Sequence, residues 1–153
     1  PGNYWSVAEL KVNGRPRRFD DKQALDPGTW RVSASLCNED APNAVDGDLE
    51  KRWGTGRGQT GGEWFTVDLG EERTACNVVL NAGKSTMDYP RRYEVYVSRD
   101  GEDWLGPIAG GEGKAALTNI PLLPRPGRYL KILQTGEGGR WWWSIYDLKI
   151  YAE

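Results

Sequence analysis

Residues 139–151, GRWWWSIYDLKIY, are the part of the sequence that most constrains the fold. Behind three consecutive tryptophans the chain alternates between two sets of residues, Ile145, Asp147 and Lys149 in one and Tyr146, Leu148 and Ile150 in the other. Side chains of a β-strand point alternately to its two faces, so this period of two predicts a strand with one buried face. The three tryptophans cannot all point into the core, and we expect at least one of them at the surface of the preceding loop.

A similar pattern occurs near the start of the chain. Residues 4–12 (YWSVAELKV) match residues 142–150 (WWSIYDLKI) position for position, with Trp, Ser, Leu and Lys identical. Two half-buried strands of a β-rich chain can look alike by chance, but this match favours a repeat. We interpret the early copy as the closing strand of an upstream repeat or as a strand with an equivalent place in the sheet. Either interpretation predicts that the sequence was cut from a longer protein.

Composition and charge limit both the fold class and the partners. The 153 residues suit one domain, and 20 Gly and 9 Pro with 8 Trp and 7 Tyr indicate many short strands separated by tight turns. The 20 basic and 22 acidic residues are interspersed and give a net charge of -2. Such a chain lacks the basic face or polybasic run that binds nucleic acid or an anionic membrane. No apolar run approaches membrane-spanning length, so we expect no transmembrane segment.

The residue inventory also argues against an enzyme. The chain contains no histidine, which removes Ser-His and Cys-His nucleophile pairs and histidine metal sites. Acidic residues are plentiful enough for a two-carboxylate glycosidase, but no pair is singled out by its spacing. We therefore expect a domain that binds rather than catalyses.

The two cysteines, Cys37 and Cys76, lie in separate predicted segments. In a secreted protein they could form a disulfide. So small a count is weak evidence for a bridge, and we favour two half-buried thiols.

Alternating segments and turn signals recur along the rest of the chain. Strands are predicted at residues 29–35, 63–69, 74–81, 92–98 and 128–134, with further short strands between residues 104 and 126. Residues 38–53 are rich in Asn, Asp, Gly and Pro and predict a long irregular loop, a kind of loop that is often functional or held by a metal. No capped run with helical period exceeds about two turns. Short strands at regular spacing are typical of a β-sandwich.

Five motifs in this order resemble one known family. They are AVDGD (44–48) with RW (52–53), WFTVDLG (64–70), YEVYVSRDG (93–101), RYLKI (128–132) and WSIYDLKIY (143–151). Together they resemble the coagulation factor V/VIII type C (discoidin) family and, within it, the family 32 carbohydrate-binding modules appended to bacterial glycosidases. We therefore divide the chain into an N-terminal strand and connector (residues 1–28) and a domain of this family (residues 29–153). The resemblance implies an all-β, discoidin-type jelly-roll β-sandwich of two antiparallel sheets.

The resemblance also implies a function. It points to a noncatalytic carbohydrate-binding module that targets a larger secreted bacterial enzyme or surface protein to glycans. The implied partners are a mono- or oligosaccharide and covalently linked domains of a parent protein, and the implied location is secreted or at the cell surface. The alternative is a discoidin-like protein-interaction or cell-adhesion domain without sugar binding. Galactose-binding members often use a histidine, so its absence here leaves the sugar open.

The ligand site of the family lies in loops at one end of the sandwich. Sugars bind where a flat aromatic face lies beside forked or charged hydrogen-bonding side chains, and the loop at residues 82–91 and the last loop have both. The candidate ligand-binding residues are Lys84, Asp88, Tyr89, Arg91, Arg140, Trp141 and Trp142, with Arg57 and the loops at residues 38–40 and 57–59 as a rim. Trp141 is the preferred platform, because the family more often has a bulky aliphatic residue there. Trp53, Trp64 and Trp143 occupy motif positions that are core in the family.

A structural calcium ion, Ca2+, is a further implication of the resemblance. Calcium takes several hard oxygen ligands, and the implied ligands are Asn43, Asp46, Asp48 and Asp147. Lys51 departs from the family, which commonly has a hydroxyl residue at that position. Its ammonium supplies no oxygen and could itself sit against Asp46. The sequence therefore leaves open a bound calcium or a metal-free, hydrogen-bonded turn.

Overall fold

The computed structural model describes residues 24–153. Their strands are β1 (Arg31–Ala34), β2 (Trp53–Gly54), β3 (Trp64–Asn81), β4 (Arg92–Ser98), β5 (Trp104–Glu112), β6 (Leu117–Gln134), β7 (Ser144–Ile145) and β8 (Asp147–Ala152). Two short 3-10 helices, η1 (Pro27–Thr29) and η2 (Asn38–Ala44), flank β1. No helix in this part of the chain is long and apolar enough to cross a membrane. The expected repeat at residues 4–12 lies outside the described residues.

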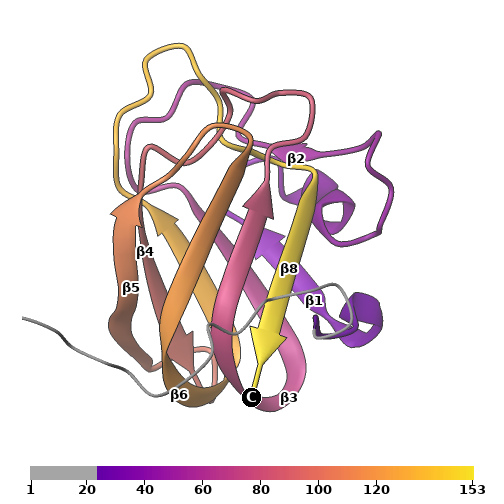
Figure 1. Cartoon of the computed structure of the whole chain (residues 1–153), viewed down its shortest axis with the longest axis vertical. Helices are drawn as coiled ribbons and strands as arrows, with labels where there is room; N and C mark the ends of the chain where they lie inside the picture. The colour runs from indigo at the N-terminus through magenta and orange to yellow at the C-terminus, as the bar shows by residue number, and fades with distance from the viewer. Residues whose placement is uncertain (1–23) are drawn as a thin grey trace, which may run out of the picture.

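Two layers of antiparallel strands form the sandwich, and β3 and β6 belong to both (Figure 1). The first half of β3 pairs with β1 and with the second half of β6, which in turn pairs with β4, and β4 pairs with β5. The second half of β3 pairs with β8 and with the first half of β6. The all-β sandwich of two antiparallel sheets is thus confirmed.

The long strands differ from the short ones that the sequence predicts. The predicted strands at residues 63–69 and 74–81 are the two halves of β3, which shifts its register between Asp68 and Arg73 and continues. Gly70 lies at this bend with φ +81°, a left-handed conformation that glycine adopts at little cost. Its N–H donates to the Asp68 carboxylate at 2.8 Å. A turn signal in the sequence therefore marks a bend between layers, because strand pairing continues on both sides of it.

Two tryptophans extend the hydrophobic core between the layers as far as the loops at one end. Trp53 and Trp143 are both 0% exposed and pack edge to face, with ring centroids 4.9 Å apart. Phe65 packs against Trp53 with its ring centroid at 5.0 Å. Both tryptophans are core residues, as predicted, but Trp64 is not. It is half-buried on the outer face of β3, where the Lys131 Nζ lies 6.0 Å from its ring centroid.

The predicted loop at residues 38–53 begins with a short helix. Ala41 and Ala44 of η2 are fully buried, which anchors this segment to the core. The segments at residues 35–63, 82–91 and 135–143 gather at one end of the sandwich, at the top of Figure 1. Cys37 and Cys76 are half-buried and do not form a disulfide, in agreement with the favoured interpretation.

Candidate functional site

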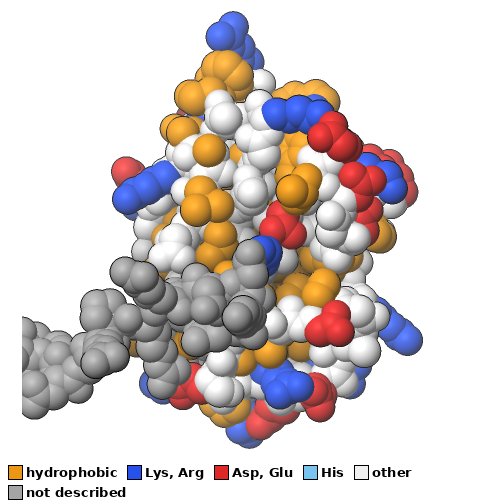
Figure 2. Space-filling view, turned by 45° about the vertical axis from the view of Figure 1, so that its right-hand side comes forward, with side chains coloured by type: hydrophobic (Ala, Val, Ile, Leu, Met, Phe, Trp, Pro, Cys, Tyr) orange, Lys and Arg blue, Asp and Glu red, His pale blue; other side chains and the backbone are white. Residues whose placement is uncertain are grey.

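A hollow at this end is lined by residues from the two loops that the sequence singles out. It has a volume of about 250 Å3 and is lined by Lys84, Ser85, Thr86, Met87, Asp88 and Trp141. The structure thus brings together Lys84, Asp88 and Trp141 from the candidate set. Met87 also lines the hollow and is 38% exposed, but the candidate set does not contain it. An apolar side chain in a polar loop is the sequence signal that could have identified it. Figure 2 shows basic, acidic and hydrophobic side chains side by side at the loop-bearing end of the molecule.

A larger hollow, of about 510 Å3, lies at the opposite end of the sandwich, beside the turn between β4 and β5. Its lining contains Arg99, Arg125 and Leu105 but no aromatic residue. Of these two hollows, only the smaller combines a tryptophan with hydroxyl and charged groups. It also lies among the loops that the sequence singles out, and we therefore regard it as the candidate site.

Trp141 and Arg140 form the exposed edge of the site. The Trp141 backbone N–H donates to the Gly138 carbonyl at 3.0 Å, which fixes the turn that carries its half-buried ring. The exposed Arg140 places its guanidinium carbon 4.7 Å from the centroid of that ring, in cation–π contact. The pair offers an apolar ring and a cluster of N–H donors next to each other.

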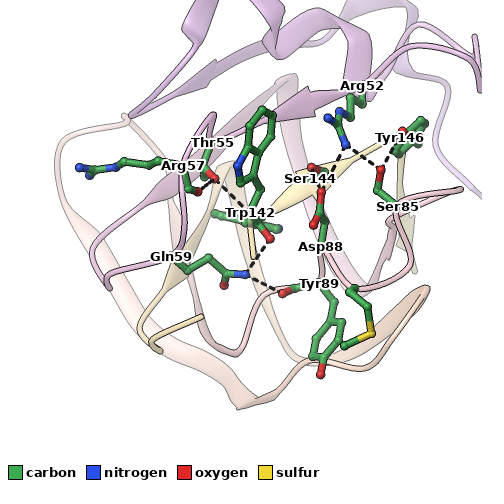
Figure 3. Close-up of polar contacts among 12 residues, drawn as sticks. Arg52, Thr55, Arg57, Gln59, Ser85, Asp88, Tyr89, Trp142, Ser144 and Tyr146 are labelled. Atoms are coloured by element: carbon green, nitrogen blue, oxygen red, sulfur yellow. Dashed lines mark hydrogen bonds and ion pairs between the residues drawn. The ribbon is translucent and has the colours of Figure 1, made fainter. Parts of the chain in front are cut away.

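Trp142 has a different role from Trp141. Its ring lies 5.0 Å from the guanidinium carbon of Arg52, which is also 5.9 Å from the Tyr146 ring (Figure 3). Trp142 does not line the hollow. The structure therefore makes it a packing partner of Arg52, a residue that the sequence analysis noted only as part of a motif.

Asp88 is buried at the base of the hollow, with 8% of its surface exposed. Its Oδ2 accepts hydrogen bonds from the Ser144 hydroxyl at 2.8 Å and from Arg52 Nη1 at 3.3 Å. Arg52 Nη1 also donates to the Ser85 hydroxyl at 2.7 Å. Figure 3 shows these groups converging from three segments of the chain. The Asp88 carboxylate therefore ties loops together, and at least one of its oxygens is already occupied.

Gln59 joins three loops. It belongs to the loop at residues 57–59, which the sequence predicts as part of the rim of the site, but only 2% of its surface is exposed. Its Nε2 donates to the carbonyls of Tyr89 and Trp142, both at 2.9 Å (Figure 3). Its Oε1 accepts from the Arg91 N–H at 3.0 Å. Its own N–H donates to the Trp141 carbonyl at 3.1 Å. Gln59 therefore fixes the backbone on which the candidate residues stand.

The remaining candidates in this area lie outside the lining of the hollow. The guanidinium carbon of Arg91 lies 3.8 Å from the centroid of the Tyr89 ring, and its Nη2 donates to the Met87 carbonyl at 2.8 Å. Both residues thus brace the loop that carries Lys84. The exposed Arg57 side chain points away from the cluster in Figure 3.

A second buried group links the start of β3 to the last loop. Glu63 is 3% exposed and accepts hydrogen bonds from the Thr60 N–H at 2.6 Å and from Gln134 Nε2 at 2.9 Å. Gln134, which is 0% exposed, also donates to the Gly136 carbonyl at 2.9 Å. Burial alone would raise the pKa of Glu63, but these hydrogen bonds outweigh it and hold the pKa below its ordinary value. We call Gln59, Glu63 and Gln134 the loop clamp.

The residues that the family resemblance assigns to calcium make other contacts. Asn43 Nδ2 donates to the Arg52 carbonyl at 3.1 Å, and the Asp147 Oδ2 lies 3.9 Å from Lys149 Nζ. Asp46 and Asp48 face the ammonium of Lys51. Within residues 24–153, no three His, Cys, Asp or Glu side chains gather in a way that could hold a metal ion. These side chains carry the oxygens that calcium prefers, but as they are arranged here, with a lysine ammonium against two of the carboxylates, they do not form an oxygen shell around a common point.

Similar proteins agree with this architecture. A family 32 carbohydrate-binding module from a family 31 glycoside hydrolase of Clostridium perfringens has a TM-score of 0.73 at 18% identity, covering 86% of this chain and 96% of that one. The family 32 module of NanJ from the same organism, in complex with galactose, has a TM-score of 0.69 at 18% identity, covering 84% and 98%. These likenesses confirm the discoidin-type jelly-roll fold.

A sequence relative adds a different context. The galactose oxidase of Gibberella zeae is 27% identical over 146 residues, covering 84% of this chain. The chain spans only 20% of the length of that protein. The F5/8 type C domain family matches residues 29–148, well over half of the chain. The chain therefore belongs to the F5/8 type C domain family.

Proposed function

We propose that this domain is a noncatalytic carbohydrate-binding module that holds a secreted or surface-attached parent protein close to glycans. The observation that carries the proposal is the half-buried Trp141 beside a hollow lined by Lys84 and the hydroxyl residues Ser85 and Thr86. An aromatic ring next to hydrogen-bonding groups suits a sugar, which has an apolar C–H face and polar edges. The galactose complex of the NanJ module and the complex of another Clostridium perfringens module with GalNAc-β-1,3-galactose support this class of ligand.

In this proposal the sugar stacks its C–H face on Trp141 while Lys84 and Thr86 bond its hydroxyls. The loop clamp and Asp88 hold the backbone in place, so little order has to be gained on binding. One stacking aromatic and a shallow hollow leave much of the sugar in water, and the affinity for a single site is therefore weak. The domain would act by raising the local concentration of its parent protein at a glycan surface.

The test is a glycan array followed by calorimetry on any glycan that binds. Trp141→Ala should abolish binding, whereas Trp104→Ala removes another half-buried tryptophan, near the opposite end of the sandwich, and should leave binding intact. Aryl glycosides should show no turnover with either protein. A blank array with well-folded wild-type protein would contradict the proposal and favour an adhesion domain that binds protein.

A further inference from the structure

The turn at residues 46–51 is closed by its own side chains. Asp46 Oδ1 accepts the N–H of Asp48 at 2.8 Å, and Asp48 Oδ1 accepts the N–H of Glu50 at 3.0 Å. The Lys51 N–H donates to the Asp48 carbonyl at 3.1 Å, which brings the lysine side chain back over the two aspartates. One oxygen of each carboxylate is thus used within the turn.

The second oxygen of each carboxylate faces one ammonium. Lys51 Nζ lies 3.4 Å from Asp48 Oδ2 and 3.8 Å from Asp46 Oδ2. The next carboxylate along the chain, Glu50, contacts the ammonium of Lys84. A lysine ammonium therefore lies near each of the three acidic groups at residues 46–50.

We propose that the Lys51 ammonium takes the place of a structural divalent cation in this turn, so that the domain needs no calcium to hold it. A calcium ion at the two aspartates would have to displace this ammonium, and Lys51 has no oxygen to offer it. The neutralising charge is thus covalently part of the chain and is present at any calcium concentration. The inference does not depend on whether the domain binds sugar.

The experiment compares thermal unfolding in chelator with unfolding in about 5 mM Ca2+, a concentration above the dissociation constants of weak extracellular calcium modules. The wild-type Tm should be the same in both conditions. Lys51→Thr frees both carboxylates and adds a hydroxyl oxygen, and its Tm should rise by about 2–4 °C in calcium. Lys114→Thr removes an exposed ammonium from a different loop and should not respond. Calorimetric titration with calcium compares binding to the folded wild type and to folded Lys51→Thr directly.

Lys51 has a side chain that is 57% exposed, so the variant should fold. A wild-type Tm that rises with calcium would overturn the proposal. An unresponsive Lys51→Thr protein would overturn it as well, because the lysine would then not be standing in for the ion. Calcium binding by Lys51→Thr alone would support it.

Discussion

The base and the edge of the candidate site are built in opposite ways. At the base, Gln59, Glu63, Gln134 and Asp88 are nearly inaccessible, and each bonds to groups from other loops. At the edge, Lys84 and Arg140 are exposed, and their contacts are with Glu50 and the Trp141 ring. Polar side chains in neighbouring loops can therefore serve either to order the backbone or to meet a ligand, and burial separates the two roles.

Polar groups at the base and at the edge should therefore contribute differently to the free energy of unfolding. A buried donor or acceptor that loses its partner costs about 1–3 kcal/mol, because it has already been taken out of water. An exposed ion pair contributes little, since water and salt screen it. Substitutions at the base should therefore reduce stability, and substitutions at the edge should reduce only binding.

The largest effect is expected for Gln59→Leu. This change keeps the volume but leaves the carbonyls of Tyr89 and Trp142 and the N–H of Arg91 without their partner. We expect a loss of about 3 kcal/mol in the free energy of unfolding and a Tm lower by roughly 6–12 °C. Urea unfolding and calorimetry measure both quantities.

Arg57→Leu is the matched control, because Arg57 lies two residues away in the same loop and is exposed. Its stability should stay close to wild type. If the two variants lost similar stability, the distinction between base and edge would be wrong for this loop.

A smaller, pH-dependent effect is expected for Glu63. Its folded pKa lies below the ordinary value, so the unfolded chain binds the proton more tightly and stability falls as the pH is lowered. The contribution is complete above the ordinary pKa of a glutamate, about 4.3, and is lost as the pH falls through the lower pKa of the folded state. Glu63→Gln should lose about 1–3 kcal/mol at pH 7, and its stability should fall less steeply between about pH 5 and 3. If the stability of Glu63→Gln fell with pH as steeply as that of the wild type, Glu63 would not be the source of this pH dependence.

The sequence predicted the sandwich well, because strand periodicity is a local signal. The alternation in residues 92–98 matches β4. The alternation after the three tryptophans holds only from Asp147 onward, in β8, because Ile145 lies in the separate strand β7, which pairs with β2 and buries it completely. Predictions of strand ends were less accurate at Gly70. Whether a chain stops or bends there depends on partners more than 40 residues away, such as the pairing of Arg73 with Gly127.

The site was predicted in part, for a related reason. Tryptophan and lysine in polar loops are visible in the sequence, and Lys84 and Trp141 do line one hollow. The roles of Gln59 and Arg52 were not visible, because an amide or a guanidinium in a glycine-rich or charged loop gives no sign of burial. Their partners, such as the Trp142 carbonyl 83 residues from Gln59, are brought close only by the fold.

The smallest effect on stability is expected for Lys84→Gln. Lys84 is exposed, and its contact with Glu50 is also exposed, so the Tm should change little. Sugar binding should nevertheless weaken several-fold, because the ammonium that lines the hollow is replaced by a neutral amide. Glu50→Gln is the informative partner variant, since it removes the same ion pair but keeps the ammonium. If both variants lost affinity equally, the ligand would require the ion pair and not the ammonium alone. Glu50 would then also belong to the edge of the site.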